Sequence, residues 1–186
     1  MGLLNSRIQS WQRRELWKAW IQVALWLGII VVESTASLSS ENTARFLYPI
    51  FHFLFGLDPI QFLVWHHLLR KSGHVIGYAV LSLLFFRAWR ITLPVAGGVR
   101  WSMVWARIAF FMAALVASLD EWHQTFLPSR TGTIQDVILD SCAALIAQIL
   151  LFLILRRLET PGSGPDLPIA SKPDESARTV SSQVAD

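Results

Sequence analysis

Apolar residues in this chain are gathered into four segments, which polar residues separate. The apolar runs lie at about residues 19–32, 75–86, 104–119 and 137–155. With their flanking residues, the runs approach the roughly 20 mostly apolar residues that a membrane-spanning helix needs. The pattern therefore predicts an all-α, polytopic membrane protein with a four-transmembrane-helix bundle.

The segment between the first two runs has an amphipathic pattern. Residues 34–58 are too mixed in polarity to span a bilayer, but apolar side chains recur at helical spacing over Asn42–Phe55. These side chains are Phe46, Leu47, Ile50, Phe51 and Leu54. Their aromatic content and the few charges favour an interfacial helix between spans one and two, lying in the headgroup region. A helix packed on the bundle is the alternative.

Turn and capping residues mark the start of the next helix. Gly56 is placed to end the amphipathic helix. Asp58 and Pro59 have the order of an N-cap residue followed by proline at the first helical position. We expect the second spanning helix to start there and to run toward Trp89, with its spanning part at 75–86.

Basic residues orient the chain in the membrane. They cluster near the N-terminus, between the second and third spans, and after the fourth span, whereas the loops 34–66 and 120–136 carry more acid than base. Because cytoplasmic loops carry an excess of lysine and arginine, both termini are expected in the cytoplasm, as in a bacterial inner-membrane protein. The basic pair Arg70-Lys71 is the exception, because it falls at the end of the second span that is expected to face outward. The sequence around Ser34–Ala36 resembles a signal-peptidase site, but Glu33 and the long basic region favour an uncleaved anchor.

Composition agrees with this organisation. Of 186 residues, 53% are hydrophobic and 16% charged, whereas a soluble domain carries about a quarter charged residues. From Thr160 the chain is rich in proline, glycine and serine, which predicts disorder. We therefore expect a basic cytoplasmic arm at 1–18, a transmembrane domain at 19–157 and a disordered cytoplasmic tail at 158–186. Cys142 is the single cysteine, which excludes an intrachain disulfide.

Tryptophans lie near the ends of the expected spans, as in an interfacial aromatic belt. They are Trp11, Trp17, Trp65, Trp89, Trp101, Trp105 and Trp122. We assign them no chemistry.

A group of polar residues falls near the outer boundary of the expected bundle. As candidate ligand-binding residues we take Lys71, His74, Tyr78, Asp120, Glu121, Gln124, Arg130 and Asp136. Residues three and four positions apart share a helix face, which groups several of them and also aligns Asp136 with Asp140. Ionisable groups inside spans cost a few kcal/mol each and usually face a partner or a wet cavity. The pattern favours one convergent site. The alternative is a set of ion pairs that only fix helix register, namely Lys71 with Asp120 or Glu121 and Arg130 with Asp136.

The residue types suggest what this site binds. Arg130, beside Pro128, is the expected anion contact, because a guanidinium grips phosphate or carboxylate through two hydrogen bonds. Lys71 adds a point charge. The Asp120–Glu121 pair could hold a cation, share a proton or accept hydrogen bonds. The histidines show no HExxH or similar spacing, so neither a metal nor a cofactor is predicted.

These residues resemble a known family. The pattern Lys71-x-x-His74-x-x-x-Tyr78, Asp120-Glu121-x-x-Gln124, Pro128-x-Arg130 and Asp136 is similar to that of the VanZ-like bacterial membrane proteins, over roughly residues 20–155. Where that family usually carries an asparagine and glycines, this chain has Asp140, Ala143 and Ala147. The resemblance implies a polytopic envelope protein, and the founding member is associated with teicoplanin resistance.

Three functions follow from these patterns. The first is a binding or accessory protein whose partners are membrane lipids, a lipid-linked cell-wall precursor or a lipophilic glycopeptide; no nucleic-acid partner is expected. The second is an enzyme acting on lipid phosphate or pyrophosphate. Ser72-Gly73-His74 and Ser129-Arg130 resemble pieces of the type 2 phosphatidic acid phosphatases, with Asp136 in the nucleophile position and Asp140 in the orienting one. The third is a structural membrane protein.

Overall fold

The structure is a computed structural model, and it describes residues 2–35, 40–95, 98–128, 130 and 132–158, apart from the side chains of 2–9 and 40–42. These described residues form five α-helices and no strand. The helices are α1 (Gly2–Ser34), α2 (Ser40–Phe55), α3 (Pro59–Thr92), α4 (Met103–Gln124) and α5 (Ile134–Leu158). The expected tail at 158–186 lies, beyond Leu158, outside the described residues.

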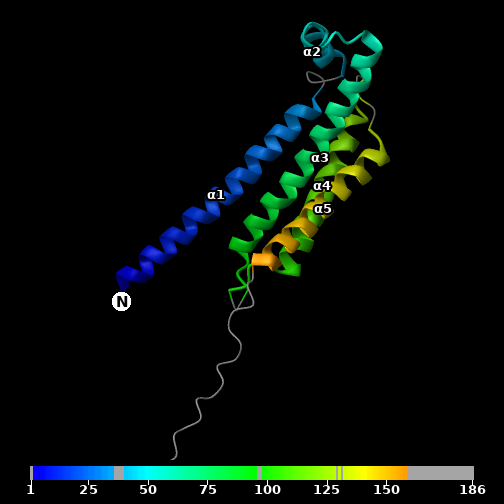
Figure 1. Cartoon of the computed structure of the whole chain (residues 1–186). Helices are drawn as coiled ribbons and strands as arrows, with labels where there is room; N and C mark the ends of the chain where they lie inside the picture. Colours follow the sequence, from blue (N-terminus) through cyan, green and yellow to red (C-terminus); the bar gives the residue numbers. More distant parts are fainter. Residues whose placement is uncertain (1, 36–39, 96–97, 129, 131, 159–186) are drawn as a thin grey trace, which may run out of the picture.

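Four of the described helices are long and apolar enough to cross a membrane. They are α1 from Ser10 onward, α3, α4 and α5. Figure 1 shows α3, α4 and α5 side by side, with α1 approaching them toward its C-terminal end and α2 lying across that end of the bundle. The protein is thus an all-α, multi-pass membrane protein, as predicted.

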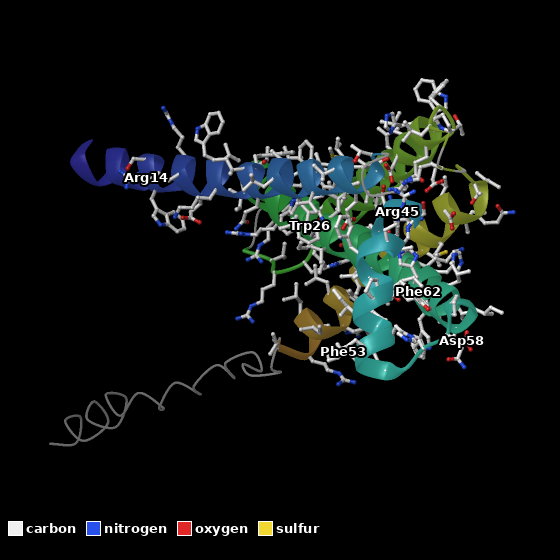
Figure 2. The ribbon with its side chains drawn as sticks, turned by 90° about the horizontal axis from the view of Figure 1, so that it is seen from above. Arg14, Trp26, Arg45, Phe53, Asp58 and Phe62 are labelled. Atoms are coloured by element: carbon white, nitrogen blue, oxygen red, sulfur yellow. The ribbon has the colours of Figure 1, made fainter. Side chains whose placement is uncertain are left out.

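The central helix is α3, which packs against each of the other four helices. The helix α1 lies closest to the bundle at its C-terminal end and diverges from the other helices toward its N-terminus (Figures 1 and 2). The ion pair between Glu15 and Arg87 of α3, at 3.9 Å, still links its N-terminal half to the bundle. Trp26 lies where α1 meets the bundle and donates a hydrogen bond of 2.9 Å to the Gly77 carbonyl of α3. The expected basic arm and the first span lie on one continuous helix.

Small side chains let α4 and α5 approach α3 closely. Ala106, Ala109, Ala113 and Ala117 form one buried face of α4. On α5, Ala143 and Ala147 are buried as well, at the two positions where glycines were expected from the family pattern. Small residues at such interfaces favour close backbone packing between membrane helices. This packing brings polar residues near the N-terminal end of α3, the C-terminal end of α4 and the N-terminal end of α5 within reach of one another.

The turn before α3 forms as its residues predict. Gly56 adopts a left-handed conformation with φ of 65° directly after α2. The carboxylate of Asp58 then accepts hydrogen bonds from the backbone N–H groups of Ile60 and Gln61, at 2.9 and 2.8 Å. This capping box satisfies donors at the start of a helix that have no partner within it, and it fixes where α3 begins.

The helix α2 combines the two arrangements that its sequence allowed. Tyr48 and Phe51 pack their rings against Phe62 of α3, with centroids 5.3 and 5.8 Å apart. On the opposite side, Phe46 and Phe53 are 79% and 87% exposed, and Figure 2 shows Phe53 near the free end of α2. One face of α2 therefore docks on the bundle while the other presents aromatic side chains, as a helix at the headgroup level does.

Two sequence-based expectations need correction. The helix α4 does not end near residue 119 but continues through Gln124, so the polar residues Asp120 to Gln124 belong to a helix and not to a connecting loop. Trp105 is not part of an interfacial belt, since it is 2% exposed and its indole N–H donates to the Leu93 carbonyl at 2.7 Å. In both cases, packing against α3 supplies buried partners that the sequence pattern did not reveal.

Candidate functional site

Three helices bring polar side chains together at the end of the bundle where α2 lies. Helical spacing places Lys71, His74 and Tyr78 on one face of α3, and this face is turned toward α4 and α5. Tyr78 is fully buried, and its hydroxyl donates a hydrogen bond to Oδ2 of Asp120 on α4 at 3.1 Å. This hydroxyl joins α3 to the first carboxylate of the cluster.

The carboxylates on α4 are buried and held by neutral donors. Asp120 and Glu121 are 9% and 4% exposed. The side-chain amide of Gln124 donates to Oδ2 of Asp120 at 3.2 Å and to Oε1 of Glu121 at 3.3 Å. The backbone N–H of Thr133 donates to Oε2 of Glu121 at 2.9 Å. These donors fix the orientation of both carboxylates without neutralising their charge.

Thr133 also starts α5. Its hydroxyl donates to Oδ2 of Asp136 at 2.9 Å, and the backbone N–H of Asp136 donates to the Thr133 hydroxyl oxygen at 3.2 Å. The other oxygen of Asp136, Oδ1, accepts a hydrogen bond of 3.1 Å from Lys71 of α3. Lys71 therefore pairs with Asp136, and not with Asp120 or Glu121, the partners that the ion-pair alternative had suggested.

The loop before α5 packs tightly against the end of α4. A Cβ atom on Gly132 would collide with the backbone oxygen of Glu121 and would lie 2.7 Å from Cγ2 of Thr125. Only glycine fits at this close contact between the loop and α4. The contact lets the Thr133 N–H reach the Glu121 carboxylate.

His74 and Asp140 form a second link between α3 and α5. His74 Nδ1 lies 3.5 Å from Oδ2 of Asp140, whose side chain is 1% exposed. Neither carboxylate oxygen of Asp140 accepts a hydrogen bond from the described residues. Burying a carboxylate without hydrogen bonds costs several kcal/mol unless a positive charge lies nearby or the group takes up a proton, so a charged His74, a cation close to it or a proton would balance this group.

Arg130 contacts the end of α1, unlike the other predicted residues. Its Nη2 donates to the backbone carbonyls of Glu33, and of Thr35 at 3.1 Å, at the C-terminal end of α1. Burial and the neighbouring Arg70 lower the pKa of the Arg130 guanidinium, whereas Asp120 and Glu121 oppose this effect. An arginine nevertheless stays protonated in proteins. Arg130 thus carries a positive charge beside the carboxylates and ties α1 to the loop between α4 and α5.

A pocket lies next to this cluster, where α1, α2 and α3 meet. Its volume is about 230 Å³, and His74 and Arg130 form part of its wall. The other lining residues are Glu33, Thr43, Leu47, His66, Leu69, Arg70 and Gly73. His66 is held in place by a contact of 2.9 Å between its Nε2 and the Thr43 hydroxyl of α2. The pocket therefore presents two arginines and two histidines, together with one carboxylate and apolar side chains.

Seven of the eight candidate residues from the sequence are linked through this cluster, and Arg130 lines the pocket beside it. His74, Asp120 and Glu121 come closest, since each offers a ligand atom and these atoms lie within 4.8 Å of one another. Sequence reasoning did not select Thr133, Asp140, His66 or Arg70 as site residues. For Thr133, the spacing Thr-x-x-Asp at the start of α5 was a usable signal. For Arg70, the basic pair Arg70-Lys71 was a signal, because it breaks the expected distribution of charge. For His66 no signal was available, because α2 completes its surroundings.

Comparisons with known proteins agree with this description. No curated protein and no solved structure matches the chain. A sequence model of the VanZ/LLP1 family matches residues 19–156. The match includes most of each spanning helix and every residue of the cluster and the pocket. The chain therefore belongs to the VanZ/LLP1 family.

Proposed function

We propose that this protein resides in the bacterial cytoplasmic membrane and binds the anionic headgroup of a lipid or of a lipid-linked cell-wall precursor at the outer face. The observation that carries the proposal is the pocket lined by Arg70, Arg130, His66 and His74. Guanidinium groups are preferred phosphate ligands because their donors match the oxygens in pairs.

The place of the pocket supports a lipid ligand. Its wall includes Leu47 and Leu69 beside the charged groups, and α2, which contributes Leu47, also carries the exposed aromatic residues Phe46 and Phe53. A lipid can therefore keep its acyl chains against the apolar helices while its headgroup enters the pocket.

The size of the pocket favours the smaller of the expected ligands. Pockets that enclose a drug-sized molecule measure about 300–1,000 Å³, whereas this pocket measures about 230 Å³. It suits a phosphate-bearing headgroup and is too small to enclose a glycopeptide. A link to teicoplanin resistance rests on the family match alone.

The distribution of basic residues supports the orientation. Arg87, Arg90, Arg100 and Arg107 lie at or near the connection between α3 and α4, and Arg156 and Arg157 lie at the end of α5. By the positive-inside rule these ends face the cytoplasm. The pocket and the carboxylate cluster then face the outside.

The contacts of the described residues do not favour a phosphatase. The oxygens of Asp136, the position of a nucleophile, accept hydrogen bonds from Lys71 and Thr133. The hydroxyl of Ser72 donates to the Leu68 carbonyl of its own helix at 2.8 Å, away from the cluster. Incubating the purified protein with undecaprenyl pyrophosphate and phosphatidic acid tests this alternative, and we expect no phosphate release.

Native mass spectrometry of the purified full-length protein tests the binding proposal. Mixed micelles would contain phosphatidylglycerol and phosphatidylcholine with the same acyl chains. We expect preferential retention of phosphatidylglycerol, and a several-fold loss of that preference in Arg70→Gln. Arg45→Gln is the matched control, because Arg45 is an exposed arginine of α2 at the same end of the bundle but outside the pocket. Equal retention by the wild type and both variants would contradict the proposal.

A further inference from the structure

We infer that His74, Asp120 and Glu121 bind one divalent transition-metal cation of the Zn²⁺ class. The three residues come from α3 and α4, and their ligand atoms lie within 4.8 Å of one another. A cation at their centre would lie within coordinating reach of all three after small side-chain movements. Such a site goes beyond headgroup binding and does not depend on it.

The donor set determines the class of cation. Carboxylates alone suit Mg²⁺, Ca²⁺ and Mn²⁺, whereas an imidazole ligand suits Zn²⁺ and other first-row transition metals. One histidine with two carboxylates supplies three protein ligands, as in zinc sites that keep a further position open for water or substrate.

The groups around the triad have the arrangement that a metal site requires. Metal-bound histidines usually direct their second ring nitrogen at a carboxylate, which fixes the orientation of the ring. Nδ1 of His74 faces Asp140 at 3.5 Å, so Nε2 is the nitrogen that would ligate the cation. Ligating carboxylates are likewise held by outer hydrogen bonds, and here Tyr78, Gln124 and the Thr133 N–H supply them.

Asp140 is the independent observation that points to a cation. Its carboxylate is 1% exposed, is directed at His74 and accepts no hydrogen bond from the described residues on either oxygen. A bound cation would supply the positive charge that such a carboxylate needs and would favour the imidazole tautomer that donates from Nδ1. Lys71 cannot do so in this arrangement, because it is engaged with Asp136.

This site is not visible in the spacing of histidines along one helix. The triad joins one histidine of α3 to two adjacent carboxylates of α4. Adjacent residues on a helix point in directions about 100° apart. Asp120 and Glu121 would therefore bind one cation from two different directions, and His74 of α3 would supply the third ligand.

Metal analysis of the full-length protein tests the inference. The protein is purified in detergent without a histidine tag, treated with EDTA, dialysed against Zn²⁺ and analysed by inductively coupled plasma mass spectrometry. We expect one equivalent of Zn²⁺ per chain, loss of that equivalent in Glu121→Gln, and an affinity about 10- to 100-fold weaker in Asp140→Asn. Glu15→Gln is the control and retains the metal, because Glu15 of α1 pairs with Lys18 and Arg87 and lies outside the triad.

A second measurement keeps the inference testable if those variants fail to fold. In a Cys142→Ser background, His74→Cys replaces the nitrogen ligand with a thiolate, and Co²⁺ bound there gives a sulfur-to-cobalt charge-transfer band. Ser72→Cys in the same background is the control, because Ser72 is exposed and outside the triad. We expect the band only in His74→Cys.

Two results would overturn the inference. The first is a wild-type protein that retains no more Zn²⁺ than a membrane protein without such a cluster. The second is a stoichiometric metal that Glu121→Gln leaves in place. Either result would mean that protons shared among the carboxylates and His74 balance this cluster. The two proposals can fail separately. An Arg70→Gln protein that loses its lipid preference but retains the metal would show that lipid binding and metal binding are independent.

Discussion

The hydroxyl of Tyr78 on α3 donates a hydrogen bond of 3.1 Å to Oδ2 of Asp120 on α4, and both side chains are buried. It joins two spanning helices at the level of the carboxylate cluster. Because Gln124 still donates to the same oxygen, the loss of the hydroxyl removes one of two donors and does not leave the oxygen without a partner.

Tyr78→Phe is therefore expected to destabilise the protein by about 1 kcal/mol, the typical net contribution of a hydrogen bond. The measurement is SDS-induced unfolding in mixed micelles. Tyr48→Phe, at the other tyrosine of the chain, is the control and should leave the unfolding midpoint unchanged. A Tyr78→Phe protein as stable as the wild type would mean that this contact contributes nothing to helix packing.

Gly132→Ala is expected to destabilise the protein by about 1–3 kcal/mol, as overpacking typically does. The added methyl group collides with the Glu121 carbonyl and displaces the loop. Thermal unfolding in detergent measures the effect. Gly28→Ala, in a helix where a Cβ meets nothing within 4 Å, should instead stabilise by about 0.5–1 kcal/mol. If both substitutions behaved alike, the close packing of the loop on α4 would be refuted.

Gln148 and Ser82 link α5 to α3 deep in the bundle. The Gln148 amide donates to the Ser82 hydroxyl oxygen at 2.8 Å and to the Ser82 carbonyl at 3.0 Å. We expect a double-mutant cycle of Ser82→Ala and Gln148→Leu to give a coupling energy of about 0.6–1.7 kcal/mol, the range found for polar pairs between membrane helices. In a matched cycle, Ser118→Ala takes the place of Ser82→Ala beside Gln148→Leu. The two destabilisations should then be additive, because the Ser118 hydroxyl donates within its own helix. Coupling of equal size in both cycles would contradict the assignment.

The proposed orientation predicts which single cysteines react from outside the cell. In a Cys142→Ser background, Arg45→Cys on α2 should be labelled by a membrane-impermeant maleimide in intact cells. Val99→Cys, in the connection between α3 and α4, should react only after the membrane is permeabilised. The reverse pattern would place the pocket and the cluster in the cytoplasm and would exclude the proposed role at the outer leaflet.

The spans, the cap at Asp58 and the turn at Gly56 could be derived from the sequence, because each depends on residues that are close together along the chain. Apolar length decides whether a helix can span a bilayer, and side chain to backbone hydrogen bonds decide where it begins. The same kind of reasoning grouped Lys71, His74 and Tyr78 on one face. It misjudged the end of α4, because Asp120 to Gln124 look like loop residues until their buried partners on α3 and in the loop before α5 are known.

Which polar groups meet is decided only by the tertiary structure. The sequence narrowed the site to eight residues, but the pairing of Lys71 with Asp136, the burial of Asp140 against His74, and the use of Arg130 to hold the end of α1 depend on the relative rotation and depth of the helices. That geometry is set by the small residues of α4 and α5 packing against α3. Residue spacing along one helix carries no information about it, since contacts between helices are fixed by the packing of all of them together.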